Sequence, residues 1–213
     1  SNLNHLSHFT LGGGAKSNCV RANGNHAYFT SNNGLYVVNI SNPSNPQNLG
    51  NIPNTSNLLL ENLDLENSTL AVCAHADGVL LFDISEPSNP NLISTIETNN
   101  AWAVALLNGY AYVASNDDIL VADISDTGNP VSLIEIQTGN AVKDLVIANG
   151  LLYAAIGSDG INIYDLDNPS SPQYLANYNS NTLAHRIATM EDDKLAVADW
   201  DDVEVLQWDG STF

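Results

Sequence analysis

The feature that most constrains this chain is a sequence repeat of about 42 residues. Four segments align without gaps at residues 34–46, 78–90, 118–130 and 160–172: GLYVVNISNPSNP, GVLLFDISEPSNP, DILVADISDTGNP and GINIYDLDNPSSP. A fifth, degenerate copy, DDVEVLQWDG, occupies residues 201–210. One anchor position recurs at residues 39, 83, 123, 165 and 207, so the spacings are 44, 40, 42 and 42. A period in this range, with several short strands in each unit, is typical of β-propeller blades.

Each repeat predicts four short antiparallel strands. The first two strands are joined by Asn23-Gly24, Asn108-Gly109 or Asn149-Gly150, pairs that tolerate the positive φ angles of a type I′ hairpin. The third strand alternates in character, as in LLFDI at residues 80–84, so its side chains point to the two sheet faces in turn. A corner rich in Ser, Asn and Pro follows, and the proline ends the ladder before the fourth strand.

These copies predict a single all-β domain over residues 1–213, a five-bladed β-propeller of four-stranded antiparallel blades. The expected blades cover residues 15–53, 57–97, 101–138, 141–179 and 183–208. The last copy stops after its third strand, at Trp208, while Leu3–Leu11 begins with an unattached fourth-strand pattern. We therefore expect residues 1–11 to form the outer strand of the last blade, which would close the ring and remove an open sheet edge.

At the four strand-and-corner segments the sequence resembles the LVIVD-repeat family of β-propellers. The resemblance covers nearly the whole chain, although the third copy has Thr127-Gly128 where the others have Pro-Ser. It implies the propeller fold, and it implies a bacterial or archaeal surface or secreted protein. The family supplies no catalytic motif to carry over. We accordingly expect an extracellular or cell-surface location, although the chain itself contains no secretion signal.

The charge balance excludes two classes of partner. The formal net charge is −19, which repels phosphate backbones and anionic lipids, so neither nucleic acid nor a membrane surface is expected as a partner. Apolar runs such as Ala101–Leu107 are too short to span a bilayer, so we expect no membrane insertion by this domain. The two cysteines, Cys19 and Cys73, form no zinc pattern and are interpreted as small apolar residues.

The repeated acidic residues are interpreted as parts of turns. Asp83, Asp123 and Asp165 recur at the corners, where a carboxylate can accept a backbone N–H two residues on. The alternative is a calcium site, but calcium needs several oxygens within a short stretch and proline interrupts this one. A ring of cation sites at the acidic second turns is a further alternative. We expect no metal and no cofactor.

Positions that differ between blades are the freest to serve a ligand. Aligning the hairpins places one large or polar side chain from each blade at the start of an inner strand, at the mouth of the central channel. These residues are Asn18, Glu61, Trp102, Lys143 and Arg186, and His75, His185 and Trp200 map to the same face. Cations beside aromatic rings suit a carboxylated or sulfated sugar or a peptide carboxylate. The simpler alternative is that the cations neutralise Asp144 and Glu61 while the tryptophans pack between blades.

Three functions are compared on this basis. The favoured hypothesis is an extracellular binding or interaction module whose partner is a small anionic or carbohydrate ligand or a protein. The second is a carbohydrate-active enzyme that uses Glu61 and Asp144 as its carboxylate pair. The third is a structural spacer that binds nothing. No nucleophile triad, phosphate loop or His-rich cluster stands out, so we do not expect an enzyme.

Overall fold

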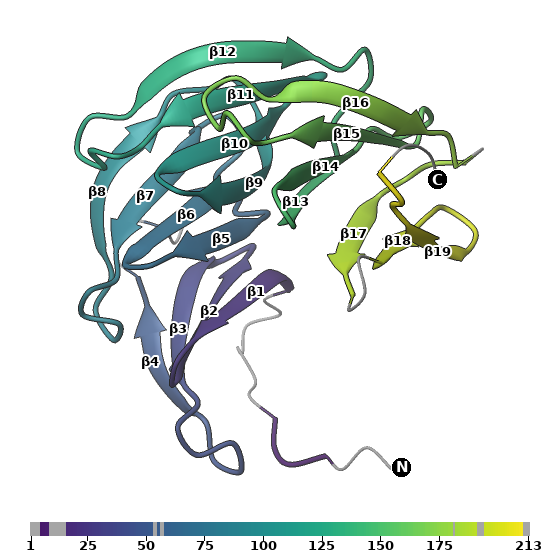
Figure 1. Cartoon of the computed structure of the whole chain (residues 1–213). Helices are drawn as coiled ribbons and strands as arrows, with labels where there is room; N and C mark the ends of the chain where they lie inside the picture. Colours follow the sequence, from purple (N-terminus) through teal and green to yellow (C-terminus); the bar gives the residue numbers. More distant parts are fainter. Residues whose placement is uncertain are drawn as a thin grey trace.

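The computed structural model describes residues 5–8, 16–52, 55, 58–180, 182–190 and 194–210. These residues form an all-β structure of five antiparallel sheets arranged as the blades of a propeller, as Figure 1 shows. Blades 1 and 2 contain β1 (Ser17–Asn23), β2 (His26–Ser31), β3 (Gly34–Asn39), β4 (Gln47–Asn51), β5 (Leu63–Glu66), β6 (Thr69–Cys73), β7 (Val79–Asp83) and β8 (Asn91–Ile96). Blades 3 and 4 contain β9 (Ala101–Leu107), β10 (Tyr110–Ser115), β11 (Asp118–Asp123), β12 (Val131–Gln137), β13 (Asp144–Ala148), β14 (Leu151–Ala155), β15 (Ile161–Asp165) and β16 (Gln173–Tyr178). Blade 5 contains β17 (Arg186–Thr189), β18 (Lys194–Ala198) and β19 (Val203–Gln207). No helix in this part of the chain is long and apolar enough to cross a membrane.

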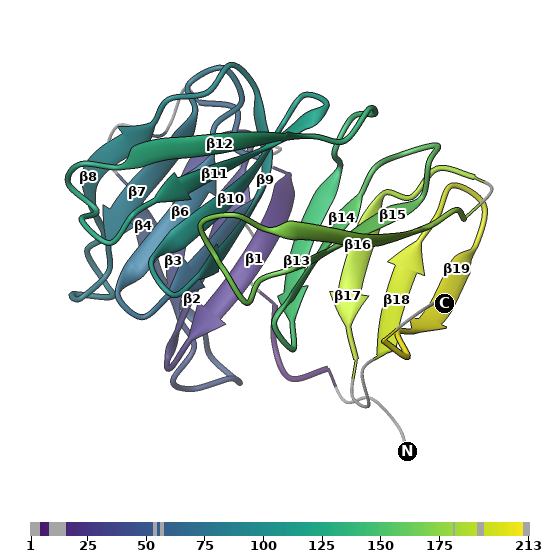
Figure 2. The same cartoon turned by 45° about the horizontal axis from the view of Figure 1, so that its top comes forward.

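Each sheet is a meander in which consecutive strands are neighbours, so every blade folds from one continuous stretch of chain. The first strand of each blade lies toward the centre of the propeller and the last lies outside (Figure 1), and Figure 2 shows the same blades tilted toward the reader. Blades 1 to 4 share a register shift between the third and outer strands, as at Val121/Ala122 in blade 3 and Ile163/Tyr164 in blade 4. The repeat therefore extends to the backbone geometry, since a β-bulge at one position bends each outer strand in the same way.

The inner hairpins follow from their turn residues. Asn108 and Gly109 have φ angles of 51° and 79°, and Asn149 and Gly150 have 51° and 76°, as the Asn-Gly pairs predict. The prediction was wrong for Asn23-Gly24. There Asn23 is the last residue of β1 and pairs with His26, so the turn begins at Gly24 and only that residue needs the positive φ.

The corner residues cap the turns as predicted. The carboxylates of Asp83, Asp123 and Asp165 each accept a backbone N–H from the residue two positions on, at 2.7–2.8 Å. Hydrogen bonds from Ser85 and Ser125 hold the pKa of the Asp83 and Asp123 carboxyls below the usual range. Asn39 makes the same contact in blade 1 with an amide oxygen, so the contact requires an acceptor and not a charge.

The core is divided among the spaces between blades. Four clusters of buried side chains lie between blades 1 and 2, 2 and 3, 3 and 4, and 4 and 5. Val79 and Leu81 of β7 are fully buried against blade 3, and burying each such side chain stabilises the fold by about 1.5–3 kcal/mol. Cys73 is buried in this layer and Cys19 is partly buried, both as free thiols. Stability thus depends on each blade having a neighbour.

The predicted closure by the N-terminal strand is not confirmed. Residues 5–8 form no strand, and the Ser7 hydroxyl donates to the carbonyl of Pro43, so this segment lies against the corner of blade 1. That carbonyl belongs to a turn and not to a strand, so it can accept the hydrogen bond from the Ser7 hydroxyl. Residues 1–4 and 9–11 of the predicted strand lie outside the described residues. Within the described part, blade 5 has three strands, and its Val203 is 68% exposed where the equivalent Val79 is fully buried.

Candidate functional site at the channel mouth

The starts of the inner strands bring together several of the predicted site residues. Glu61 precedes β5, Lys143 precedes β13 and Arg186 begins β17. The Arg186 guanidinium lies 3.1 Å from a carboxylate oxygen of Glu61, 125 residues away in sequence, and donates a second bond to the Lys143 carbonyl at 2.8 Å. Blades 2, 4 and 5 are therefore joined through one side chain. Arg186 and Glu61 neutralise each other, as the simpler sequence hypothesis held.

The ammonium group of Lys143 lies over an aromatic ring. Its Nζ is 5.5 Å from the centroid of the Trp102 indole, within cation–π range. The imidazole of His75 meets the same indole edge-on at 4.7 Å. Within the described part of the chain, Lys143 makes no ion pair with a carboxylate. We name Glu61, His75, Trp102, Lys143 and Arg186 the mouth cluster.

His75 occupies a backbone conformation that favours glycine. Its φ is 49°, and its carbonyl accepts the Ala101 N–H at 2.9 Å at the junction with the next blade. At the same junction of blade 4, Gly157 has a φ of 62° and accepts the Ala184 N–H. A side chain in this region costs free energy that glycine avoids, so His75 strains the backbone at this position. Such residues concentrate at functional sites.

The remaining predicted residues lie at the same ends of their blades. The side chain of Asn18 donates to the Leu60 carbonyl at 2.7 Å, directly beside Glu61. His185 and Trp200 form a separate ring pair with centroids 6.0 Å apart, and Trp200 is 72% exposed. Trp200 therefore does not pack between blades, whereas Trp102 lies against the core between blades 3 and 4.

The carboxylates considered for catalysis are already engaged. One Glu61 oxygen holds Arg186, and the buried Asp144 accepts the N–H groups of Leu145 and Ile187 at 3.1 and 2.9 Å. Burial raises the pKa of the Asp144 carboxyl, against the lowering effect of the Ile187 N–H and the nearby Arg186. Asp144 thus satisfies an inner-edge N–H of β17 that no further strand can reach.

Sequence reasoning missed an equivalent pair deeper in the channel. Asp64 accepts the Leu106 N–H of the next blade at 2.9 Å and lies 3.5 Å from the Arg21 guanidinium. Burial raises the pKa of the Asp64 carboxyl, while Leu106 and Arg21 lower it. The scarcity of basic residues was the available signal, because Arg21 is one of only five in the chain. Among the described residues, no group of three or more His, Cys, Asp or Glu side chains could hold a metal ion.

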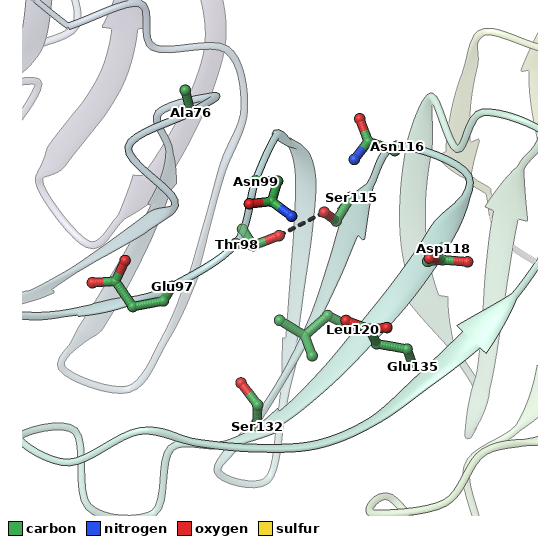
Figure 3. Close-up of a pocket in the computed structure, with 10 residues that line it drawn as sticks. All are labelled: Ala76, Glu97, Thr98, Asn99, Ser115, Asn116, Asp118, Leu120, Ser132 and Glu135. Atoms are coloured by element: carbon green, nitrogen blue, oxygen red, sulfur yellow. Dashed lines mark hydrogen bonds between the residues drawn. The ribbon is translucent and has the colours of Figure 1, made fainter.

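A cavity of about 410 Å³ lies between blades 2 and 3 and is lined by none of the mouth-cluster residues, although it reaches Ala76, the neighbour of His75. Its lining includes the carboxylates of Glu97, Asp118 and Glu135 (Figure 3). The hydroxyls of Thr98 and Ser115 are hydrogen bonded to each other on one side, as the dashed line in Figure 3 shows. Sequence reasoning did not predict this cavity, because it forms where the connection between two blades leaves the sheet face uncovered.

Comparison with known proteins supports the fold. The family model described as LVIVD repeat matches residues 12–53, 72–98, 99–138 and 139–180. No curated protein sequence matches the chain. Similar solved structures include the RRP9 WD40 repeats, with 12% identity and a TM-score of 0.74 over 94% of this chain and 63% of that one. A chain of the Mitotic Checkpoint Complex has 15% identity and a TM-score of 0.73 over 89% of this chain and 61% of its own length. The computationally designed Ika8 protein has 13% identity and a TM-score of 0.70 over 90% and 58%. The chain spans about three-fifths of each of these structures, and at such identities the likeness concerns the fold alone.

Proposed function

The chain belongs to the LVIVD-repeat family of β-propellers, and on that premise we propose that it is a binding module whose mouth cluster takes an anionic ligand. A propeller-repeat fold is consistent with a protein-interaction module. The ligand class that suits the cluster best is a carboxylated or sulfated sugar, because the cluster combines a cation with aromatic faces. We further propose an extracellular or cell-surface location, in keeping with the family resemblance.

The observation that carries this proposal is the state of Lys143. In a chain of net charge −19, this ammonium group lies over Trp102 and makes no ion pair with any described carboxylate. A ligand carboxylate or sulfate would supply the missing counter-charge, and the indole would offer an apolar face to a sugar ring. The strained His75 supports the same location, since its imidazole braces that indole.

The engagement of the carboxylates favours binding over catalysis. A glycosidase needs one carboxylic acid to deliver a proton and a second carboxylate to act on the sugar or on a water. Here Glu61 is paired with Arg186 and Asp144 is bonded to backbone N–H groups. We therefore propose no enzymatic activity for this domain.

The test is a binding titration with acidic oligosaccharides. A sulfated heparin-derived disaccharide and an unsulfated uronic-acid disaccharide serve as probes, with a neutral disaccharide for comparison. Lys143→Ala should weaken binding of the acidic probes about 10- to 100-fold, because a charge-assisted contact is lost, and added salt should weaken wild-type binding. Lys194→Ala is the charge-matched control, since Lys194 begins β18 at the opposite end from Ala198 and should leave binding unchanged.

A second variant separates a loss of binding from a loss of stability. His75→Gly should keep or raise the melting temperature, because glycine suits the φ of 49°, while it weakens binding by releasing Trp102. Equal affinity of wild type and Lys143→Ala for the acidic probes, or no binding of them by the wild type, would overturn the proposal.

A further inference from the structure

A second cavity, of about 600 Å³, lies between blades 3 and 4, one blade on from the cavity in Figure 3. The two are related by the repeat, because each is bounded by a connection between blades and by the third and outer strands of the following blade. Leu120, Ser132 and Glu135 line the first, and the register-equivalent Asn162, Tyr174 and Asn177 line the second. The two cavities therefore occupy equivalent places in the repeat but are lined by different side chains.

Blade 4 departs from blades 2 and 3 at the positions that line this cavity. Asn162 pairs with Asn177, whereas the equivalent pairs are Leu120 with Glu135 and Leu80 with Thr95. Asn162 is 7% exposed, at a position where leucine serves the fold in two other blades. Leucine would pack at this position at least as well as asparagine does. A buried amide group destabilises the fold unless it is hydrogen bonded.

The amides and a tyrosine form a fixed polar network. Asn162 donates to the Tyr164 hydroxyl at 3.1 Å, and Asn177 donates to the Asn162 side-chain oxygen at 3.0 Å. Asn177 also donates to the Asp159 and Ile161 carbonyls, at 2.8 and 3.2 Å, so its nitrogen is anchored on three acceptors.

The network leaves one acceptor and one donor unused at the cavity. Among the described residues, none donates to Asn177 Oδ1, and none accepts the proton of the Tyr164 hydroxyl. Burial raises the pKa of Tyr164, so this hydroxyl keeps its proton at neutral pH. A fixed acceptor and a fixed donor that line one cavity match the hydroxyl groups of a polyhydroxylated ligand, since a hydroxyl can both donate and accept.

An aromatic face lies on the same side. Tyr174 is 58% exposed and meets Tyr164 edge-on, with ring centroids 5.8 Å apart. Its register-equivalents are Ser132 and Leu92, so blade 4 alone among these three presents a ring here. A ring held in place at low entropic cost offers a flat apolar surface, and Gln137 and Thr138 add polar groups at the rim.

The charge of the lining selects between ligand classes. Among the described residues that line the cavity, Asp159 is the only charged one, and none is a cation. The cavity therefore does not attract anions, in contrast to the mouth cluster. Its volume is within the range of small-molecule sites, which combine apolar surface with a few fixed polar groups. A neutral polyhydroxylated ring satisfies all of these features.

We propose that the cavity between blades 3 and 4 is a second binding site, distinct from the mouth cluster, and that it binds a neutral carbohydrate. The sugar ring packs on Tyr174, while hydroxyls of the sugar donate to Asn177 Oδ1 and accept from Tyr164. The two sites have no residue in common.

The experiment is a ligand-observed and protein-observed NMR titration of the full chain with neutral disaccharides. The probes are cellobiose, maltose, mannobiose and N,N′-diacetylchitobiose at millimolar concentrations. At least one should shift the amide signals of β15 and β16. Tyr174→Ala should weaken its binding about tenfold or more, because the stacking surface is lost.

Two further variants separate binding from folding. Asn162→Leu restores the residue of blades 2 and 3, so it should leave the melting temperature within a few degrees of wild type while weakening binding by a similar factor. Ser132→Ala alters the equivalent position of the first cavity and should change nothing. The proposal is overturned if no probe binds, if binding survives both Tyr174→Ala and Asn162→Leu, or if it is lost on Lys143→Ala. The last outcome would show that the neutral sugar binds at the mouth cluster. If the acidic probes fail to bind in the titration proposed for the mouth cluster, the proposal for this second site is unaffected.

Discussion

Two glycines, one in the turn before β14 and one in the turn after it, allow the cost of a backbone clash to be separated from the cost of a backbone conformation. Gly150 and Gly160 have nearly the same φ, 76° and 80°. A Cβ added at Gly150 would have no heavy atom within 4 Å, whereas one at Gly160 would lie 2.0 Å from the Tyr178 carbonyl oxygen and 2.8 Å from the Ser180 nitrogen. Both atoms belong to the main chain, one at a strand end and one in the connection that follows it. The clash therefore cannot be relieved by rotating a side chain.

The two alanine variants should therefore differ in stability. Each substitution costs about 1–2 kcal/mol because an L-residue is forced into the left-handed region. Gly160→Ala adds overpacking against backbone, a further cost of about 1–3 kcal/mol, since the connection to blade 5 must move. For a domain of this size each kcal/mol lowers the melting temperature by about 2–4 °C.

Urea denaturation followed by circular dichroism and tryptophan fluorescence measures both free energies of unfolding, and coincidence of the two probes checks two-state behaviour. Asparagine variants sharpen the comparison, because asparagine tolerates positive φ. Gly150→Asn should recover much of the loss of Gly150→Ala, and Gly160→Asn should recover none. Equal losses for Gly150→Ala and Gly160→Ala would refute the claim that the approach of the Tyr178 carbonyl makes Gly160 obligatory.

Three other predictions concern closure, the corners and a buried carboxylate. Deletion of residues 1–10 should abolish cooperative unfolding or cause aggregation if this segment completes the ring, and a truncated chain that melts like the full one would reject the closure. Chelator should leave the melting temperature unchanged, and Asp83→Ala should lower it while Asp83→Asn, which keeps the acceptor for Ser85, should not; a fall with EDTA that calcium reverses would contradict the capping role. The raised pKa of Asp144 means that the folded state binds its proton more tightly than the unfolded chain, so stability should fall as pH rises from the ordinary carboxylate range through the raised value. Asp144→Asn keeps an acceptor for the Ile187 N–H and should flatten that part of the pH profile, which chemical denaturation at a series of pH values would detect.

The parts of this structure that sequence reasoning predicted are governed by interactions within a few residues. The repeat period set the number of blades, and the Asn-Gly pairs at residues 108–109 and 149–150 set two hairpins, because positive φ is a property of the residues themselves. The corner carboxylates could be assigned for the same reason, since a contact from residue i to residue i+2 depends little on the rest of the chain. The wrong prediction at Asn23-Gly24 also has a local cause, because the same two strands can pair when the turn shifts by one residue.

The candidate site could be predicted only as a set of blade-equivalent positions. Internal comparison of the repeats placed Glu61, Lys143 and Arg186 at inner-strand starts. It could not show that Arg186 reaches Glu61 rather than Asp144, because that choice depends on the angle between blades and on side-chain rotamers. Nor could it show that the ammonium group of Lys143 lies over the Trp102 ring.

The ring and the grooves were decided by tertiary structure alone. Whether Val203 is covered, as Val79 is, depends on how blade 5 meets blade 1, and no local preference of the chain encodes that contact. The cavity beside Tyr174 exists because the connection between blades 3 and 4 leaves part of a sheet uncovered. The sequence carried a trace of it in Asn162, a polar residue at a position where blades 2 and 3 have leucine. A repeat determines what each blade is, but the spaces between blades follow from packing across long sequence separations, where a small change in angle decides which side chains meet.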